Sequence, residues 1–175
     1  MKGVLLSLAR AVTLGWLVTQ YAGAATVTVQ PGQDLQAAVA AAAPGDVIEV
    51  QRGNYRVNLL IDKPLTLRGL DRPTLSGGNQ GDTIRVTAPD VVIEGLIVRD
   101  SGDDLKAQNA GIYLYPGAHR AVVRHCDLTY NLFGLWIEKA DDVRIEHNVI
   151  TGKREYASPQ RGNGVQLYNT KGAQI

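Results

Sequence analysis

Short runs of alternating hydrophobic and polar residues cover most of the chain after residue 25. Three of them share one form, a glycine followed by an aliphatic residue, any residue and a second aliphatic residue, and they begin at Gly111, Gly134 and Gly164. Alternation over four to six residues is the period of an extended strand, whereas an amphipathic helix has a period of 3.6 residues. The pattern therefore predicts an all-β protein built from short strands.

The runs recur in a fixed order, which indicates an internal repeat. Equivalent aliphatic positions fall at Ile84, Ile112, Leu135 and Val165, so the spacings are 112 − 84 = 28, 135 − 112 = 23 and 165 − 135 = 30 residues. Units this short cannot bury an apolar face alone and must stack on their neighbours. Constant strands with variable spacing predict a right-handed parallel β-helix, a solenoid. A β-sandwich also explains the alternation, but not the repeated order of strand, turn and strand.

One segment, residues 35–42, is rich in alanine and predicts a helix. Asp34 is a favourable N-cap, and Pro44 and Gly45 end the segment. A solenoid exposes apolar core and unpaired backbone groups at its first coil unless something covers them. We therefore expect a short N-terminal capping helix, followed by a first coil that begins with the strand at residues 46–50.

The N-terminal segment has the pattern of a secretory signal peptide. Lys2 and Arg10 precede an apolar core at residues 11–18, and Ala22-Gly23-Ala24 fits the cleavage rule. The apolar core is shorter than the ~20 residues that span a bilayer. We expect residues 1–24 to be a signal peptide, with an uncleaved anchor helix or a buried helix as the alternative, and residues 25–175 to form the β-helix domain.

The last repeat begins at Gly164, and no polar closing element follows it before Ile175. A solenoid that stops part way through a repeat exposes apolar surface. We therefore expect the β-helix to be truncated at its C-terminal end, with further coils missing, and this chain to self-associate.

Composition narrows the functional classes. The chain has 18 Lys and Arg against 17 Asp and Glu, a net charge of +1, which argues against a nucleic-acid binder held by charge. Its one cysteine, Cys126, cannot form an internal disulfide. Cys126 aligns with Leu96 and Asn148 at a bend that faces inward, so we expect it to be a buried small hydrophobe, and Asn148 to bond the backbone along the stack.

Outward-facing positions of successive coils stack about 4.8 Å apart. One such row contains Arg85, Tyr113, Trp136 and Gln166, and the next contains Tyr115, Glu138 and Tyr168. The aromatic side chains either stabilise an exposed sheet through cross-strand contacts or offer a docking surface for sugar or protein. Tyr113, Trp136 and Tyr168 are therefore candidate partner-binding residues.

Two long corners, residues 99–109 and 152–161, interrupt the coils at the same edge, two coils or roughly 10 Å apart. Loops along one edge of a solenoid commonly carry binding. The first corner is acidic and the second basic, so they can also pair with each other. The candidate partner-binding residues in the corners are Asp103, Asp104, Lys106, Arg154 and Arg161.

His125 and His147 occupy one row on adjacent coils, 147 − 125 = 22 residues apart. Two imidazoles at this spacing are candidate ligands for a borderline metal such as copper or zinc. Two ligands do not complete a site, and His119 lies on a different turn. Stacking of the two rings on the surface is the alternative.

The sequence lacks the motifs of several enzyme classes. It contains no phosphate-binding loop and no G-x-S-x-G nucleophile elbow. No pair of carboxylates can be assigned to opposed positions of the kind that a glycosidase uses. We therefore expect no catalytic residues and a protein that is not an enzyme.

Several segments resemble known β-helix proteins. Residues 30–39, 44–50 and 63–69 are similar to the N-terminal part of many carbohydrate-binding β-helices, including pectin esterases, polysaccharide lyases and epimerases. Residues 102–112 and 161–169 resemble the NosD family more specifically. The resemblance runs from about residue 27 to the end and matches only the N-terminal part of a longer family protein.

The resemblance to NosD implies a role in the periplasm. The family serves maturation of the copper-sulfide centre of nitrous-oxide reductase, with an ABC-type ATPase and permease and a periplasmic copper chaperone, and it is often described as copper-binding. One Met and one Cys do not make a Cu(I)-carrying surface, so a docking scaffold fits better than a copper store. We expect neither an integral membrane protein nor a nucleic-acid partner.

The alternative that the resemblance leaves open is a carbohydrate-binding or carbohydrate-active β-helix protein of the lyase, esterase or epimerase type. Tyr113, Trp136 and Tyr168 would then form its sugar platform.

Overall fold

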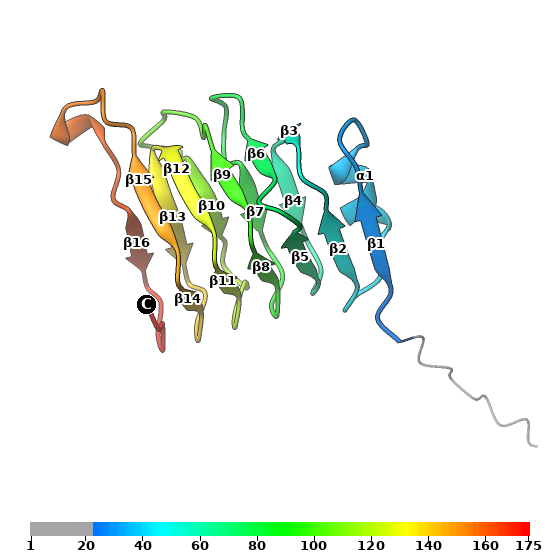
Figure 1. Ribbon diagram of the computed structural model, residues 1–175. Coiled ribbons are helices and arrows are strands. Elements are labelled where there is room, and N and C mark those ends of the chain that lie inside the picture. The colour runs from blue at the N-terminus through cyan, green and yellow to red at the C-terminus, as the bar shows by residue number, and fades with distance from the viewer. Residues whose placement is uncertain (1–22) are drawn as a thin grey trace, which may run out of the picture.

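The computed structural model, which describes residues 23–175, is a parallel β-solenoid (Figure 1). Three parallel sheets run along its axis, sheet A with six strands and sheets B and C with five each. Each full coil contributes one strand to sheet A, one to sheet B and one to sheet C, in that order. The β-helix predicted from the repeat is confirmed. The predicted signal peptide falls on residues 1–22 almost entirely, outside the described residues.

The strands are short and the helices few in the described part of the chain. Sheet A contains β1 (Thr26–Val29), β2 (Val47–Val50), β5 (Thr66–Gly69), β8 (Val92–Glu94), β11 (Val122–Arg124) and β14 (Arg144–Glu146). Sheet B contains β3 (Asn54–Arg56), β6 (Thr74–Ser76), β9 (Ile97–Arg99), β12 (Asp127–Asn131) and β15 (Val149–Gly152). Sheet C contains β4 (Leu59–Ile61), β7 (Ile84–Val86), β10 (Ala110–Leu114), β13 (Phe133–Glu138) and β16 (Val165–Tyr168). A single 3-10 turn, η1 (Ser158–Gln160), lies in the second long corner.

The strand register agrees with the repeat spacing. Ile84, Ile112, Leu135 and Val165 are consecutive partners across β7, β10, β13 and β16. Alternate residues of each strand point inward, and the aliphatic ones stack into one continuous core along the axis. Ile84, Ile112 and Leu135 have no exposed surface. The core thus consists of stacked Ile, Leu and Val side chains, which form one ladder along each sheet.

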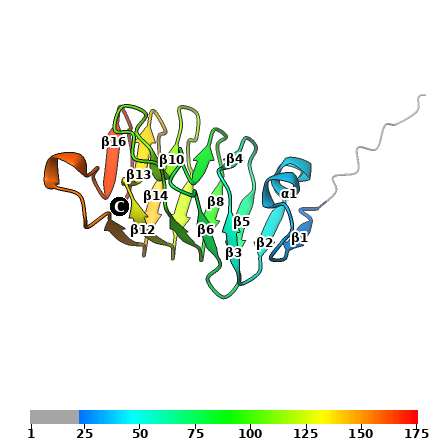
Figure 2. The same cartoon turned by 90° about the horizontal axis from the view of Figure 1, so that it is seen from above.

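The helix α1 (Leu35–Ala41) lies at one end of the stack, and β16 lies near the other (Figures 1 and 2). Asp34 is its N-cap, as predicted, and Oδ1 of Asp34 accepts the N–H of Ala37 at 2.9 Å. The side-chain amide of Gln36 bonds both the N–H and the carbonyl of Leu60, at 2.8 and 3.2 Å. The helix therefore satisfies part of the outer edge of sheet C.

The beginning of the first coil differs from the prediction. The alternating Thr and Val residues of β1 pair in parallel with β2, so a strand of sheet A precedes the helix. The first coil thus begins at Thr26 rather than at residue 46. In this coil α1 takes the place that strands of sheets B and C occupy in the later coils.

An alternating row of charges runs along the outer face of sheet A. Its members are register partners on β2, β5, β8, β11 and β14, namely Glu49, Arg68, Glu94, Arg124 and Glu146. We call this row the charge ladder. At its centre Glu94 accepts hydrogen bonds from Arg68 Nε at 2.6 Å and from Arg124 Nε at 2.7 Å.

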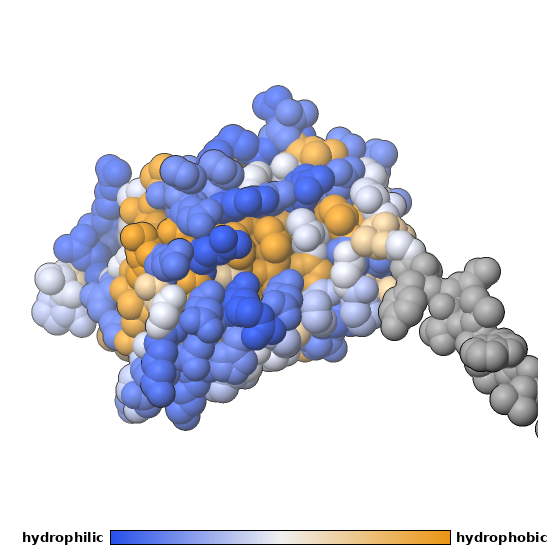
Figure 3. All heavy atoms as spheres, turned by 90° about the horizontal axis from the view of Figure 1, so that it is seen from below, coloured by the Kyte–Doolittle hydropathy of each residue, from blue (hydrophilic) through white to orange (hydrophobic). Residues whose placement is uncertain are grey.

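The arginines of the charge ladder stabilise the charged form of Glu94. Burial would raise the pKa of Glu94, but the hydrogen bonds and charges of Arg68 and Arg124 outweigh burial and hold that pKa below its ordinary value. Figure 3, a view from below, shows an apolar band along the axis between hydrophilic stretches. On this face, polar and apolar stretches therefore run side by side along the axis.

Candidate functional site

The two long corners lie against each other at the edge where sheet B passes into sheet C. The first corner joins β9 to β10, and the second joins β15 to β16. Lys153 is only 3% exposed, and its Nζ donates to the carbonyl of Ser101 at 2.9 Å and to Oδ1 of Asp103. Tyr156 donates its hydroxyl to Oδ2 of Asp103 at 2.9 Å. We call Lys153, Asp103 and Tyr156 the corner clamp. The pairing of the two corners that charge suggested is present.

The clamp uses one of the candidate residues in the corners and leaves the others exposed. Asp104 accepts the N–H groups of Lys106 and Ala107 at 2.8 and 3.1 Å and so folds the first corner into a turn. No ion pair within residues 23–175 involves Lys106, Arg154 or Arg161. These three cations therefore remain available at the surface, and their binding role stays a prediction.

A shallow hollow of about 280 Å³ lies between the corners, lined by Asp103, Leu105, Tyr156 and Gln160. Leu105 is 43% exposed there. The clamp thus holds one apolar side chain, one aromatic ring and several charges in a single surface made from two segments about 50 residues apart in sequence.

The aromatic row of sheet C has the predicted register, with Arg85, Tyr113, Trp136 and Gln166 as successive partners. Tyr113 is only 2% exposed, however. Its hydroxyl is within 2.6 Å of Glu138 Oε2 and 3.0 Å of Gln108 Oε1, and Gln108 belongs to the first corner.

Tyr113 therefore does not offer its ring to a partner, because the first corner and its neighbours cover it. The ring centroid of Tyr113 is 4.1 Å from the ring centroid of Tyr115 and 6.2 Å from that of Trp136. Burial and the hydrogen bond to Glu138 raise the pKa of Tyr113. Tyr113 thus serves cross-strand packing. Trp136 in the same row is half-buried, and Tyr168 in the neighbouring row is exposed.

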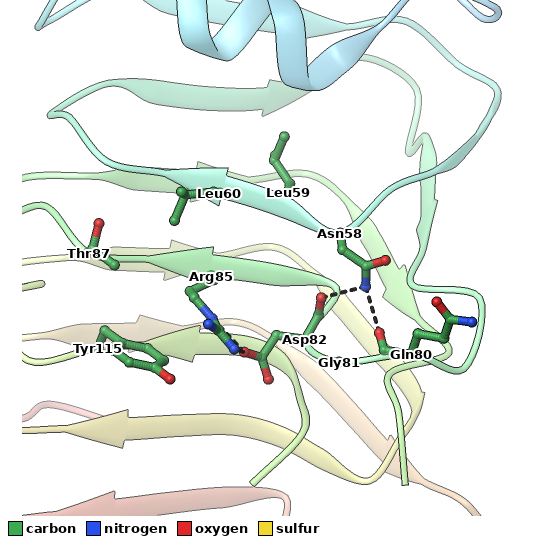
Figure 4. Close-up of a pocket in the computed structure, with 9 residues that line it drawn as sticks. All are labelled: Asn58, Leu59, Leu60, Gln80, Gly81, Asp82, Arg85, Thr87 and Tyr115. Carbon is green, nitrogen blue, oxygen red and sulfur yellow. Dashed lines mark hydrogen bonds and ion pairs between the residues drawn. The ribbon is translucent and has the colours of Figure 1, made fainter. Parts of the chain in front are cut away.

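A groove of about 610 Å³ lies at the α1 end of the same face, over β4 and β7 (Figure 4). Asp82, just before β7, is buried and accepts both Nε and Nη2 of Arg85 on one oxygen, at 2.9 and 2.7 Å. Its other oxygen accepts the N–H of Ala110 at 3.0 Å. The guanidinium of Arg85 lies 4.7 Å from the ring centroid of Tyr115. Desolvation raises the pKa of Asp82 despite these partners.

His125 and His147 stack on the surface at the bend between sheets A and B. Their ring centroids are 5.2 Å apart and the planes differ by 7°. Both residues have a φ of 54°, the left-handed region that this bend requires. An imidazole lone pair lies in the ring plane, so two stacked parallel rings do not point at one ion. Binding a metal would require at least one ring to rotate, and the pair stays a predicted rather than a formed ligand set.

No group of three or more His, Cys, Asp or Glu side chains able to hold a metal occurs within residues 23–175. Cys126 is 1% exposed, and burial raises the pKa of its thiol to about 11. Asn148 accepts the N–H of Cys126 at 2.9 Å and donates to the carbonyl of Val123 at 2.8 Å. The prediction of a buried Cys and a backbone-bonding Asn is confirmed.

Two residues central to these sites were not singled out from the sequence. Lys153 follows a glycine in a basic, polar segment, and only the fold of the other corner shows that it is buried. Asp82 precedes a strand, where acidic residues are common in turns. The carboxylate three residues before an arginine in Asp82-Thr83-Ile84-Arg85 is a signal from which this pair could have been predicted.

Comparison with known proteins supports the β-helix fold and identifies two NosD proteins as relatives. A family model described as a right handed beta helix region matches residues 63–175. The chain is 35% identical over 123 residues to a protein of Pseudomonas aeruginosa named "Probable ABC transporter binding protein NosD", covering 70% of this chain and 29% of that one. It is 30% identical over 123 residues to a protein of the same name from Stutzerimonas stutzeri, covering 70% and 28%.

The chain therefore spans less than a third of the length of these two relatives. No solved structure matches it significantly. Among the described residues, none of the helices has both the length and the apolar character needed to cross a membrane.

Proposed function

The chain belongs to the right-handed β-helix family and is homologous to NosD proteins, and from this premise we propose that it is an accessory factor in maturation of the copper-sulfide centre of nitrous-oxide reductase. In this proposal it acts in the periplasm as a docking scaffold. Its partners are an ABC-type ATPase and permease, the reductase and a periplasmic copper chaperone. The observation that carries the proposal is 30–35% identity to two proteins named as ABC transporter binding proteins.

A scaffold agrees with what the described residues offer. The two corners are joined by the corner clamp and present Lys106, Arg154 and Arg161 at one edge. Loops held on a rigid solenoid are suited to binding a partner. We assign docking to this edge.

Copper handling is assigned to the assembly rather than to a preformed site in this part of the chain. Within residues 23–175 the cysteine is buried and the two stacked histidines supply two ligands at most. A soft Cu(I) ion prefers thiolate and thioether ligands. We propose that the chain brings the copper-delivering and copper-accepting partners together.

A sugar platform on Tyr113, Trp136 and Tyr168 receives less support, because Tyr113 is buried under the first corner. Retention of uronate polymers by the purified protein, lost when Trp136 is replaced by alanine, would favour this second function over the first.

The proposal is tested by deleting the gene in a strain that makes nitrous-oxide reductase. We expect the exported reductase to accumulate without its catalytic copper-sulfide centre, as judged by metal content and visible absorption of the purified enzyme. Restoring the gene should restore the centre. A reductase with a complete centre in the deletion strain would contradict the proposal.

A further inference from the structure

We propose that the groove over β4 and β7 binds a small organic monocarboxylate, with the outward edge of Arg85 holding the carboxylate. The inference does not depend on the proposed function. It starts from a buried carboxylate, Asp82, whose side chain is 1% exposed. A charged side chain at such depth is expensive to desolvate. Asp82 nevertheless holds the guanidinium of Arg85 in place at the groove.

Asp82 uses only part of the guanidinium of Arg85. A guanidinium has five N–H donors in a planar fork. Asp82 accepts from Nε and from Nη2 through one oxygen, and Nη1 forms no hydrogen bond to any residue in the range 23–175. The side chain of Arg85 is 43% exposed. The edge formed by Nη1 and Nη2 is therefore available in the groove.

Arg85 is also held in one orientation. Asp82 restrains one side of the guanidinium, and the ring of Tyr115 lies 4.7 Å from its carbon Cζ. A planar fork that is fixed before the ligand arrives loses little entropy on binding a carboxylate. Figure 4 shows Arg85 between Asp82 on one side and Tyr115 and Thr87 on the other.

The rest of the groove fits an apolar body with a few polar contacts. Leu60, the register partner of Arg85 on β4, is 41% exposed and forms an apolar wall. Thr87 adds a hydroxyl at the rim. A volume of about 610 Å³ lies in the usual range for small-molecule sites.

The charge of the site favours a single carboxylate over a phosphate. Asp82 already offsets the charge of Arg85, so the groove has no net positive charge from this pair. A doubly charged anion gains little there, whereas one carboxylate can accept two parallel hydrogen bonds from the remaining edge. The chemistry that fits is a planar carboxylate on an apolar group.

The test is a titration of the purified chain with hexanoate and benzoate, followed by NMR. We expect saturable shifts of the Leu60, Thr87 and Tyr115 signals. Hexanamide and benzamide, which lack the charge, should bind at least about tenfold more weakly, because hydrogen bonds to a charged group are the stronger ones. Inorganic phosphate should leave the same signals unchanged.

Two variants and a matched control assign the effect to Arg85. Arg85→Gln removes the fork, and Leu60→Glu places a competing carboxylate on an exposed position beside it, which keeps the core intact. Both should abolish binding. Arg144→Gln removes an arginine that is 54% exposed on sheet A, and it should bind as the unchanged chain does.

The inference would be overturned if no saturable shifts occur in the groove, if the amides bind as well as the carboxylates, or if phosphate shifts the same signals. Unchanged carboxylate binding by a folded Arg85→Gln or Leu60→Glu variant would overturn it as well.

Discussion

The outer faces of sheet A and sheet C are built by the same coils, yet they use their side chains differently. On sheet A the two arginines of the charge ladder form ion pairs with acids of neighbouring coils. On sheet C the row that begins with Leu60 and Arg85 leaves a groove and the half-buried ring of Trp136. The repeat thus provides stability on one face and room for binding on the other.

The corners account for this difference. The bend between sheets A and B is short, and in the last three coils it has a left-handed residue at the same position, namely Gly95, His125 and His147. The corners between sheets B and C include two long insertions. The first contacts Tyr113 of sheet C through Gln108, and the second bonds to the first through Lys153. A solenoid accepts insertions at one edge without altering its strands, so the edge with insertions is where specific surfaces arise.

The largest expected effect comes from blocking the approach of the second corner to sheet C. A Cβ on Gly134 would meet the carbonyl of Gly164 and the side chain of Ile150, whereas one on Gly152 would meet nothing within 4 Å. We expect Gly134→Val to lower the free energy of unfolding by about 3 kcal/mol, measured by urea denaturation. Gly152→Val is the control, with a change within ~0.5 kcal/mol. Equal effects of the two would refute this account of the corner.

The next effect tests the corner clamp. Lys153→Met keeps the length of the side chain but leaves the carbonyl of Ser101 and Oδ1 of Asp103 without their donor. We expect a loss of about 2 kcal/mol and faster tryptic cleavage after Arg154 and Arg161. Lys139→Met, at a lysine 57% exposed, should change neither. If Lys153→Met leaves the cleavage rate unaltered, the clamp does not hold the corners together.

A smaller effect is expected in the charge ladder. Glu94→Gln should cost about 1–2 kcal/mol at neutral pH, because two charge-assisted hydrogen bonds weaken. The pKa of Glu94 is lower in the folded chain than in the unfolded one. Its contribution is therefore present above the ordinary glutamate value of about 4.3 and is lost as the pH falls through the folded-state pKa.

The stability difference between the unchanged chain and Glu94→Gln should accordingly shrink in acid, as measured by denaturation over a pH series. Glu146→Gln, at the end of the ladder with one ion pair at 3.9 Å, serves as the control. A difference that stays constant through the acid range would mean that the arginines do not stabilise the charged form.

The smallest expected effect on stability is that of Asp82, and its pH dependence should have the opposite sign to that of Glu94. Desolvation raises the pKa of Asp82 in the folded chain, so the folded state keeps its proton longer than the unfolded state. The contribution of Asp82 is fully present below the ordinary aspartate pKa and is lost as the pH rises through the folded-state value. Relative to Asp82→Asn, the unchanged chain should lose stability over that window. A gain there would contradict the burial described for Asp82.

The sequence predicted the parts of the fold that repeat. The spacing of Ile84, Ile112, Leu135 and Val165 was sufficient for the register of sheet C, because inward aliphatic residues must stack in a solenoid. It also predicted the cap at Asp34 and the buried Cys126, which depend on local geometry and alignment with neighbouring coils. It misjudged where the first coil begins, because β1 alternates Thr and Val as the later strands alternate their residues but is separated from them by α1.

The sites were less predictable because they depend on contacts between insertions. Charge indicated that the two corners could pair, but not that Lys153 would be the buried member and Arg154 an exposed one. Tyr113 was assigned correctly to an outward row, yet it is covered by Gln108 from a corner whose path has no periodicity. The stacking of His125 and His147 followed from their row, whereas the parallel orientation of the rings did not.

The central claim is that the edge with the long corners is the docking surface of a nitrous-oxide reductase maturation factor. Its most direct test is the copper-sulfide content of exported reductase in the deletion strain carrying the gene with Arg154→Glu and Arg161→Glu, both at exposed positions. We predict a reductase largely without its centre, and a normal one when Arg56→Glu and Arg144→Glu are used instead on sheets B and A. A complete centre with the corner variant, produced at normal levels, would contradict the account.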